Sequence, residues 1–175
     1  MSSVAVLGAG SWGTTFAKVL ADAGCDVTIW ARRSEVAREI HETRRNSGYL
    51  RSINLPANLD ATDSLEKALE GASQVYVAVP SQQLRDTIAI AAPLMEPDCL
   101  VISLMKGVEA LTGLRMSEVL HQAGGIDPAR IAVLSGPNLA LEIAKEQPTA
   151  AVASSLDKQT ASAVASASTN AYFKT

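Results

Sequence analysis

Aromatic residues are scarce in this sequence: phenylalanine, tryptophan and tyrosine make up 4% of the chain, whereas hydrophobic residues as a whole make up 47%. The apolar mass is therefore mostly alanine, valine, leucine and isoleucine, which suits helices packed closely on a sheet better than a β-sandwich. A hydrophobic fraction of this size is typical of a globular chain and excludes a disordered one. With 175 residues, the chain can bury one sizeable core.

Excess charge, cysteine motifs and long apolar runs are also lacking. A net charge of −3 does not favour binding to nucleic acid or to an anionic membrane. Cys25 and Cys99 have no CxxC or Cys/His spacing, so we expect two buried free thiols rather than a disulfide or a metal site. No apolar run approaches the length of a membrane span, and the first residues show no signal peptide. We therefore expect a cytoplasmic protein with no membrane span.

Apolar runs typical of strands alternate with amphipathic runs typical of helices. The predicted strands span residues 4–7, 27–30, 75–79, 99–104, 131–134 and 149–153, and the predicted helices span 12–23, 34–44, 64–70, 84–94, 114–122, 139–145 and 157–167. The polar stretch 46–58 is predicted to be a long loop, and Asp63 and Asn138 are the predicted starts of two helices. This alternation predicts an α/β fold: a doubly wound, mostly parallel sheet with helices on both faces.

The strongest motif is Gly8-Ala9-Gly10-Ser11-Trp12-Gly13, which follows the first predicted strand and opens the first predicted helix. In this pattern Gly8 allows a tight turn, Gly10 lets a pyrophosphate approach the backbone, and Gly13 lets the helix pack closely on the strand. The free N–H groups at the helix start and its positive dipole end favour phosphate binding. The motif therefore predicts a dinucleotide site in a Rossmann-type fold.

The end of the second predicted strand bears on the choice of dinucleotide. It reads Trp30-Ala31-Arg32-Arg33, with no acidic residue at the place where an NAD site holds the ribose 2′-hydroxyl. Arg32 and Arg33 can bind a 2′-phosphate and stack on adenine. NADP(H) is therefore favoured, while NAD(H) use and a merely solvated basic pair both stay open.

Three further motifs follow predicted strands: Val79-Pro80-Ser81-Gln82, Met105-Lys106-Gly107 and Ser135-Gly136-Pro137-Asn138. In a doubly wound sheet, these strand ends face the ligand crevice. Lys106 can stabilise a developing alkoxide or pair with a substrate anion, and the amides at the start of the helix after Asn138 can bind a phosphate. An ordinary surface lysine and a plain turn are the alternatives. We expect His41 and His121 to be surface residues.

The motifs at 8–13, 79–82, 104–108 and 135–140 resemble, in order and spacing, the bacterial-type NAD(P)-dependent glycerol-3-phosphate dehydrogenase family. The resemblance covers essentially the whole chain. It implies the reversible reduction of dihydroxyacetone phosphate to sn-glycerol 3-phosphate, which feeds glycerophospholipid synthesis. It also implies that residues 1–175 are the N-terminal NAD(P)-binding Rossmann domain, that a C-terminal helical domain is missing, and that the full-length protein is a homodimer.

The same resemblance assigns roles to individual residues. It implies cofactor contacts for Gly8, Gly10, Ser11, Trp12, Gly13, Arg32, Arg33, Tyr49, Pro80, Lys106 and Ala140. It implies substrate contacts for Lys106, Gly136 and Asn138, with Lys106 as a catalytic residue and no metal. Asn138 stands where relatives often have serine or threonine, which keeps a polar side chain there. The family's second catalytic lysine belongs to the helical domain beyond Thr175, so we expect this chain to bind NADP(H) with negligible turnover.

Two other functions remain possible on the same fold. A hydroxyacid or ketopantoate-type reductase shares the glycine turn, but we do not expect it to carry both Lys106-Gly107 and Gly136-Pro137-Asn138. A non-catalytic dinucleotide-sensing module needs no second domain, but it has no use for Lys106 at the crevice. The residues 172–174 are predicted to begin a strand at the point where the sequence stops, which favours a fragment.

Overall fold

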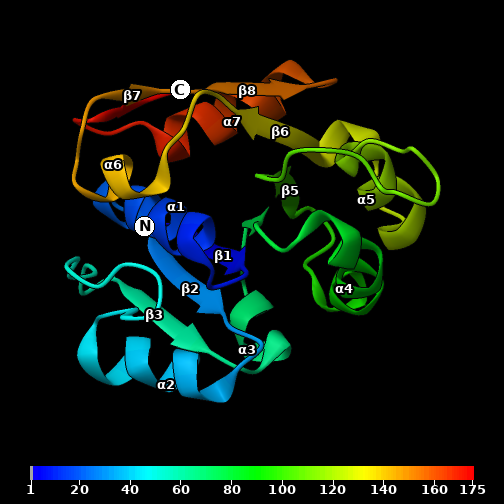
Figure 1. Cartoon of the computed structure of the whole chain (residues 1–175). Helices are drawn as coiled ribbons and strands as arrows, with labels where there is room; N and C mark the ends of the chain where they lie inside the picture. The colour runs from blue at the N-terminus through cyan, green and yellow to red at the C-terminus, as the bar shows by residue number, and fades with distance from the viewer. Residues whose placement is uncertain (1) are drawn as a thin grey trace.

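The computed structural model describes residues 2–175, and within them seven strands form one sheet in the order β3-β2-β1-β4-β5-β6-β8 (Figure 1). These strands are β1 (Ser3–Leu7), β2 (Asp26–Trp30), β3 (Leu59–Thr62), β4 (Gln74–Val77), β5 (Leu100–Ser103), β6 (Ile131–Ser135) and β8 (Val152–Ser155). Neighbours from β3 to β6 pair in parallel, and β8 pairs antiparallel with β6. The predicted Rossmann-type, mostly parallel sheet is therefore confirmed.

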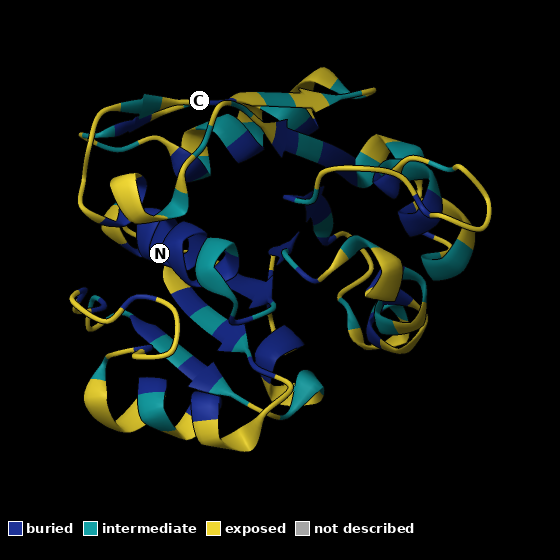
Figure 2. Cartoon of the chain, viewed as in Figure 1, coloured by how far each residue is buried: buried dark blue, intermediate teal, exposed yellow. Residues whose placement is uncertain are grey.

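Seven α-helices within residues 2–175 cover both faces of this sheet. They are α1 (Ser11–Asp22), α2 (Ser34–Thr43), α3 (Leu65–Leu69), α4 (Leu84–Ala91), α5 (Met116–Gly124), α6 (Ala140–Ala144) and α7 (Lys158–Ser168). Alternate side chains of β1 point to opposite faces, so Val4 and Val6 join a core with α1, α2, α6 and α7, whereas Ala5 and Leu7 join a core with α3, α4 and α5. Figure 2 shows the buried residues concentrated on the strands and on the inward sides of the helices.

The structure corrects four details of the predicted elements. The stretch 149–153 forms two strands: β7 (Thr149–Ala150) pairs with β9 (Phe173–Lys174), Ala151 N still donates to Lys174 O at 2.8 Å, and the chain then continues as β8 beside β6. The short edge strand β3 was not predicted. Ser64, not Asp63, caps α3, since its Oγ accepts a hydrogen bond from Lys67 N at 3.2 Å. Leu139, not Asn138, is the N-cap of α6.

Other expectations hold. The strand predicted to begin at residues 172–174 is β9. Cys25 and Cys99 are buried free thiols, and burial raises the pKa of the Cys99 thiol to about 11. His41 and His121 lie on the surface. No helix in residues 2–175 has the length and apolar character that crossing a membrane requires.

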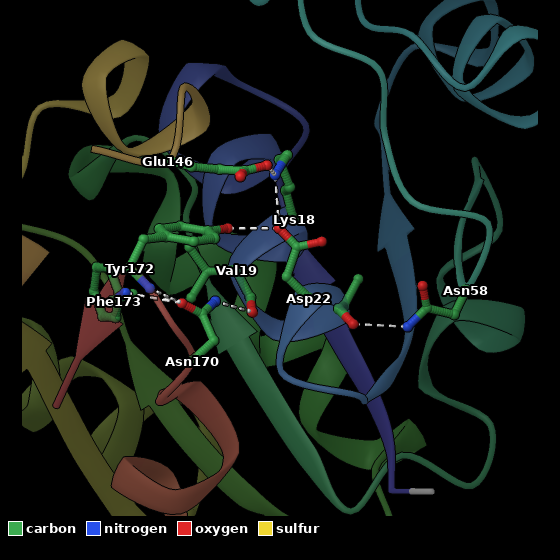
Figure 3. A network of polar contacts seen from close by, with 9 residues as sticks. Lys18, Val19, Asp22, Asn58, Glu146, Asn170, Tyr172 and Phe173 are labelled. Atoms are coloured by element: carbon green, nitrogen blue, oxygen red, sulfur yellow. Dashed lines mark hydrogen bonds and ion pairs between the residues drawn. The ribbon is translucent and has the colours of Figure 1, made fainter. Parts of the chain in front are cut away.

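A polar network around the buried Lys18 fixes α1, the helix that begins at the glycine motif (Figure 3). Lys18 is 5% exposed, and its Nζ donates to Asp22 at 2.6 Å and to Glu146 at 2.9 Å. The hydroxyl of Tyr172 donates to the same Asp22 carboxylate at 2.6 Å. Because Glu146 follows α6 and Tyr172 precedes β9, these contacts hold α1 against two segments that are distant in sequence.

Candidate functional site: a cleft at the start of α1

The turn between β1 and α1 requires glycine at two places. Gly8 has φ = +115°, and a Cβ on it would lie 2.7 Å from the carbonyl oxygen of Ala78. A Cβ on Gly13 would lie 1.9 Å from the carbonyl oxygen of Gly8, so the tight turn and the close helix packing predicted for these glycines are confirmed. No described atom outside its chain neighbours lies within 4 Å of the Cβ position of Gly10. The turn is thus closed on its inner side and open at Gly10.

A cleft of about 730 Å³ opens beside this turn. It lies at the carboxyl ends of β1, β2, β4 and β5, where the doubly wound fold is expected to bind a ligand. Of the predicted site residues, it is lined by Gly8, Gly10, Ser11, Trp12, Arg32, Arg33, Tyr49, Pro80, Lys106 and Asn138. Its volume suits a dinucleotide-sized ligand.

Three predicted site residues do not line the cleft. Gly13 packs beneath the turn instead. The carbonyl oxygen of Gly136 accepts a hydrogen bond from Lys106 Nζ at 2.9 Å, so Gly136 lies next to a cleft residue. Ala140 begins α6, and its carbonyl oxygen accepts from Thr15 Oγ1 of α1 at 3.2 Å. Gly136 and Ala140 therefore contact the cleft residue Lys106 and the helix α1, and do not line the cleft themselves.

Arg32 and Arg33 form one end of the cleft, and their guanidinium groups are exposed. Arg32 donates weakly to Gln83 Oε1 at 3.4 Å, and Arg33 lies 3.8 Å from Glu35. Exposed pairs of this kind are weak and easily exchanged for a ligand phosphate. Gln83, Asp86 and Thr87 also line the cleft, from the start of the α4 region, and were not predicted. The available signal was that they follow Pro80 closely, at the start of a predicted helix or just before it.

Lys106 and Asn138 form another part of the cleft. Lys106 is exposed, and its ammonium group contacts a neutral carbonyl oxygen, so it is free to pair with an anion. Asn138 Oδ1 is buried and has no hydrogen-bond partner within residues 2–175. Trp12 lines the cleft and also joins α1 to the end of β5, since its Nε1 donates to Leu104 O at 3.1 Å.

The loop that carries Lys106 is clamped to α4. Arg85 donates to both carboxylate oxygens of Glu109 at 2.8 Å, and Thr112 Oγ1 donates to the same carboxylate. The Arg85 and Thr112 hydrogen bonds lower the pKa of Glu109 to about 2. The side chain of Gln82 adds two bonds to the backbone of the loop, to Val108 O and from Ala110 N. This clamp was not predicted, because its members are far apart in sequence.

Replacing Glu109 by glutamine should destabilise the chain near neutral pH. The folded-state pKa of Glu109 is depressed below 4.5, so its contribution is present above that value and is lost as the pH falls toward about 2. The melting temperature of Glu109→Gln should therefore approach that of the unsubstituted chain as the pH falls from about 4.5 to about 2. Glu118→Gln is the control, because the Glu118–Arg115 pair is more exposed. A difference that does not change with pH would contradict the assignment.

Comparisons with known proteins identify relatives of the whole chain. The model of the family described as "NAD-dependent glycerol-3-phosphate dehydrogenase N-terminus" matches residues 3–161. Glycerol-3-phosphate dehydrogenase [NAD(P)+] of Leifsonia xyli subsp. xyli is 62% identical over 169 residues, which are 97% of this chain and 46% of the relative. The enzyme of the same name from Corynebacterium diphtheriae is 52% identical over 171 residues, covering 98% of this chain and 52% of the relative.

A solved structure agrees with these sequence matches. The glycerol-3-phosphate dehydrogenase of Coxiella burnetii superposes with a TM-score of 0.91 at 32% identity, over 99% of this chain and 52% of that one. The chain spans about half the length of the curated relatives that it matches.

Proposed function

Because the chain belongs to the NAD-dependent glycerol-3-phosphate dehydrogenase family, we propose that it supplies the NAD(P)(H) site for the reversible reduction of dihydroxyacetone phosphate to sn-glycerol 3-phosphate. The observation that carries the proposal is one cleft in which the open glycine turn, two arginines and Lys106 meet. A reduced nicotinamide, when bound, supplies a hydride to the substrate carbonyl. In line with the family resemblance, we place the reaction in the cytoplasm, in a homodimer, ahead of glycerophospholipid synthesis.

The residues of the cleft fit the parts of a dinucleotide. The open side of Gly10 and the first N–H groups of α1 suit a pyrophosphate, which no side chain at residue 10 obstructs. Tyr49 and Pro80 also line the cleft. Lys106 would hold the substrate and offset negative charge on its oxygen, and Asn138 offers an unpaired buried oxygen to a substrate hydroxyl. Gly136 acts by holding Lys106, and Ala140 by joining α6 to α1.

The two arginines lead us to propose a preference for NADP(H) over NAD(H). The double variant Arg32→Ala/Arg33→Ala should bind NADPH about tenfold more weakly, because exposed charge-assisted bonds to the 2′-phosphate are lost, and should change NADH binding by less than about twofold. Titration calorimetry with both coenzymes measures the two affinities. Arg38→Ala is the control, since Arg38 is exposed on α2 and does not line the cleft. Equal losses of affinity for NADPH and NADH would contradict the proposed preference for NADP(H).

The reaction itself is tested by joining this chain to the second half of the Leifsonia xyli relative. Oxidation of NADPH that depends on dihydroxyacetone phosphate supports the proposal. Turnover of ketopantoate or a 2-keto acid in its place would favour the hydroxyacid and ketopantoate type of reductase. Coenzyme binding without turnover of any of these substrates would favour the sensing module.

A further inference from the structure

Asn46 connects the long loop 44–58 to the glycine motif. It is 1% exposed, and its side-chain Nδ2 donates to the carbonyl oxygen of Ala9 at 3.0 Å and to Thr14 Oγ1 at 2.8 Å. Ala9 lies in the middle of the turn, and Thr14 lies in the first turns of α1. One amide group therefore spans the motif from the turn to the helix.

The main chain of Asn46 holds another residue of the cleft lining, Tyr49. Its carbonyl oxygen accepts hydrogen bonds from Tyr49 N at 3.1 Å and from Leu50 N at 2.7 Å. Leu50 is buried in the core, whereas the side chain of Tyr49 lines the cleft. The main chain of Asn46 thus holds Tyr49, whereas only its side chain holds the glycine turn.

The chemistry of this position favours the amide donor. Asn46 Oδ1 is buried without a hydrogen-bond partner among residues 2–175, which costs stability that an apolar side chain would not cost. An ionised aspartate has the same shape but no donor. Asparagine supplies N–H groups aimed at Ala9 O and Thr14 Oγ1, which neither an apolar side chain nor an ionised aspartate can supply.

The contact with Ala9 also orients the next N–H group. A trans peptide unit is planar, and its C=O and N–H point in opposite directions. When Asn46 holds the Ala9 carbonyl toward the protein interior, the N–H of Gly10 points the other way, toward the side on which Gly10 lines the cleft. This N–H then lies beside the first free N–H groups of α1.

We propose that Asn46 is a positioning residue for the dinucleotide pyrophosphate, which it serves by fixing the Ala9–Gly10 peptide unit. The proposal rests on the proposed function, because it assumes that a pyrophosphate binds at the glycine turn. It places the effect of Asn46 on the pyrophosphate and not on the adenosine end, where Arg32 and Arg33 lie on other elements.

Two ligands separate these effects: ADP-ribose, which contains the pyrophosphate, and adenosine 2′-monophosphate, which does not. Asn46→Ala should weaken ADP-ribose binding about tenfold and change adenosine 2′-monophosphate binding by less than about twofold. Calorimetric titrations of the chain, well below the melting temperature of each variant, give the affinities. A general loss of stability would instead weaken the binding of ADP-ribose and of adenosine 2′-monophosphate to the same extent.

Asn58 provides a matched control at the other end of the same loop. Its Nδ2 also donates to two carbonyl oxygens, those of Ala21 and Cys25, both at 2.8 Å. Figure 3 shows Asn58 beside Asp22, at the far end of α1 from the glycine motif. Asn58→Ala should lower the melting temperature and leave the affinity for ADP-ribose unchanged.

A second variant, Asn46→Asp, keeps the shape of the side chain in case the alanine variant does not fold. It should lose ADP-ribose affinity in the same selective way near neutral pH and regain part of it as the pH falls, because the protonated carboxyl is again a donor. The unsubstituted chain should show no such gain.

Unchanged ADP-ribose affinity in both Asn46 variants, equal losses for both ligands, or an equal loss in Asn58→Ala would overturn the positioning role alone. Unfolding of both Asn46 variants would also overturn it, since the role would then be structural. Failure of the unsubstituted chain to bind ADP-ribose, NADPH or NADH would overturn the proposed function, and this inference with it.

Discussion

Replacing Gly13 by alanine should abolish dinucleotide binding and lower the free energy of unfolding by about 3 kcal/mol. The added methyl group would lie 1.9 Å from the carbonyl oxygen of Gly8 and 3.2 Å from Ala78 Cβ. Two of its neighbours are backbone atoms of Gly8, so the clash is relieved only if the turn moves away from α1. That movement would also displace the N–H groups at the start of the helix. Chemical denaturation and a coenzyme titration of the same sample measure both effects.

Gly10→Ala is the matched control for this prediction. No described atom outside its chain neighbours lies within 4 Å of the new Cβ, and the φ of −76° suits alanine, so stability should change by less than about 0.5 kcal/mol. Coenzyme affinity should nevertheless fall, because the methyl group would project into the cleft where the pyrophosphate approaches. Normal stability and binding in Gly13→Ala would contradict the account of the turn.

Lys106→Met should lower kcat/KM for dihydroxyacetone phosphate about a hundredfold, in the protein completed with the second half of the Leifsonia xyli relative. Lys106 lines the cleft, and within residues 2–175 its ammonium group has one hydrogen bond, to the neutral carbonyl oxygen of Gly136. The ammonium group can therefore turn toward a charge on the substrate. Methionine keeps the length of the side chain and removes the charge. Steady-state kinetics, with NADPH affinity determined separately, distinguish a loss of substrate handling from a loss of coenzyme binding.

Lys145→Met is the control for the charge change, because Lys145 is exposed just after α6 and does not line the cleft. It should leave the kinetics unchanged. Turnover by Lys106→Met at the unsubstituted rate would remove Lys106 from the mechanism, even if coenzyme binding is confirmed.

The sequence was informative wherever the signal was local. The glycine motif lies within one strand–turn–helix unit, so both its position and its packing role could be predicted from neighbouring residues. The apolar runs of β1, β4 and β5 are continuous because both sides of these strands are buried. The order of the parallel strands then brought Arg32, Pro80 and Lys106 to the same edge of the sheet.

Features that depend on distant partners were not predictable in the same way. The edge strand β3 carries buried residues on one side only, and its sequence Leu-Asp-Ala-Thr is too short for a clear alternation. The prediction that Asn138 caps α6 was wrong, because Asn138 N donates to Gly136 O within a tight turn and the helix begins after Leu139. Asn46 lay inside a predicted polar loop, and nothing local marks it as the buried partner of Ala9.

The most direct test of the account is to locate a coenzyme on the chain by NMR. Titrating isotope-labelled chain with NADPH should produce saturable shifts of the backbone amide signals of Gly10, Ser11 and Trp12, together with those of Arg32 and Tyr49. These shifts follow from a pyrophosphate at the start of α1 and an adenosine end beside the arginines. Saturable binding that leaves the amides of the glycine turn unchanged, or no binding at all, would contradict the central claim.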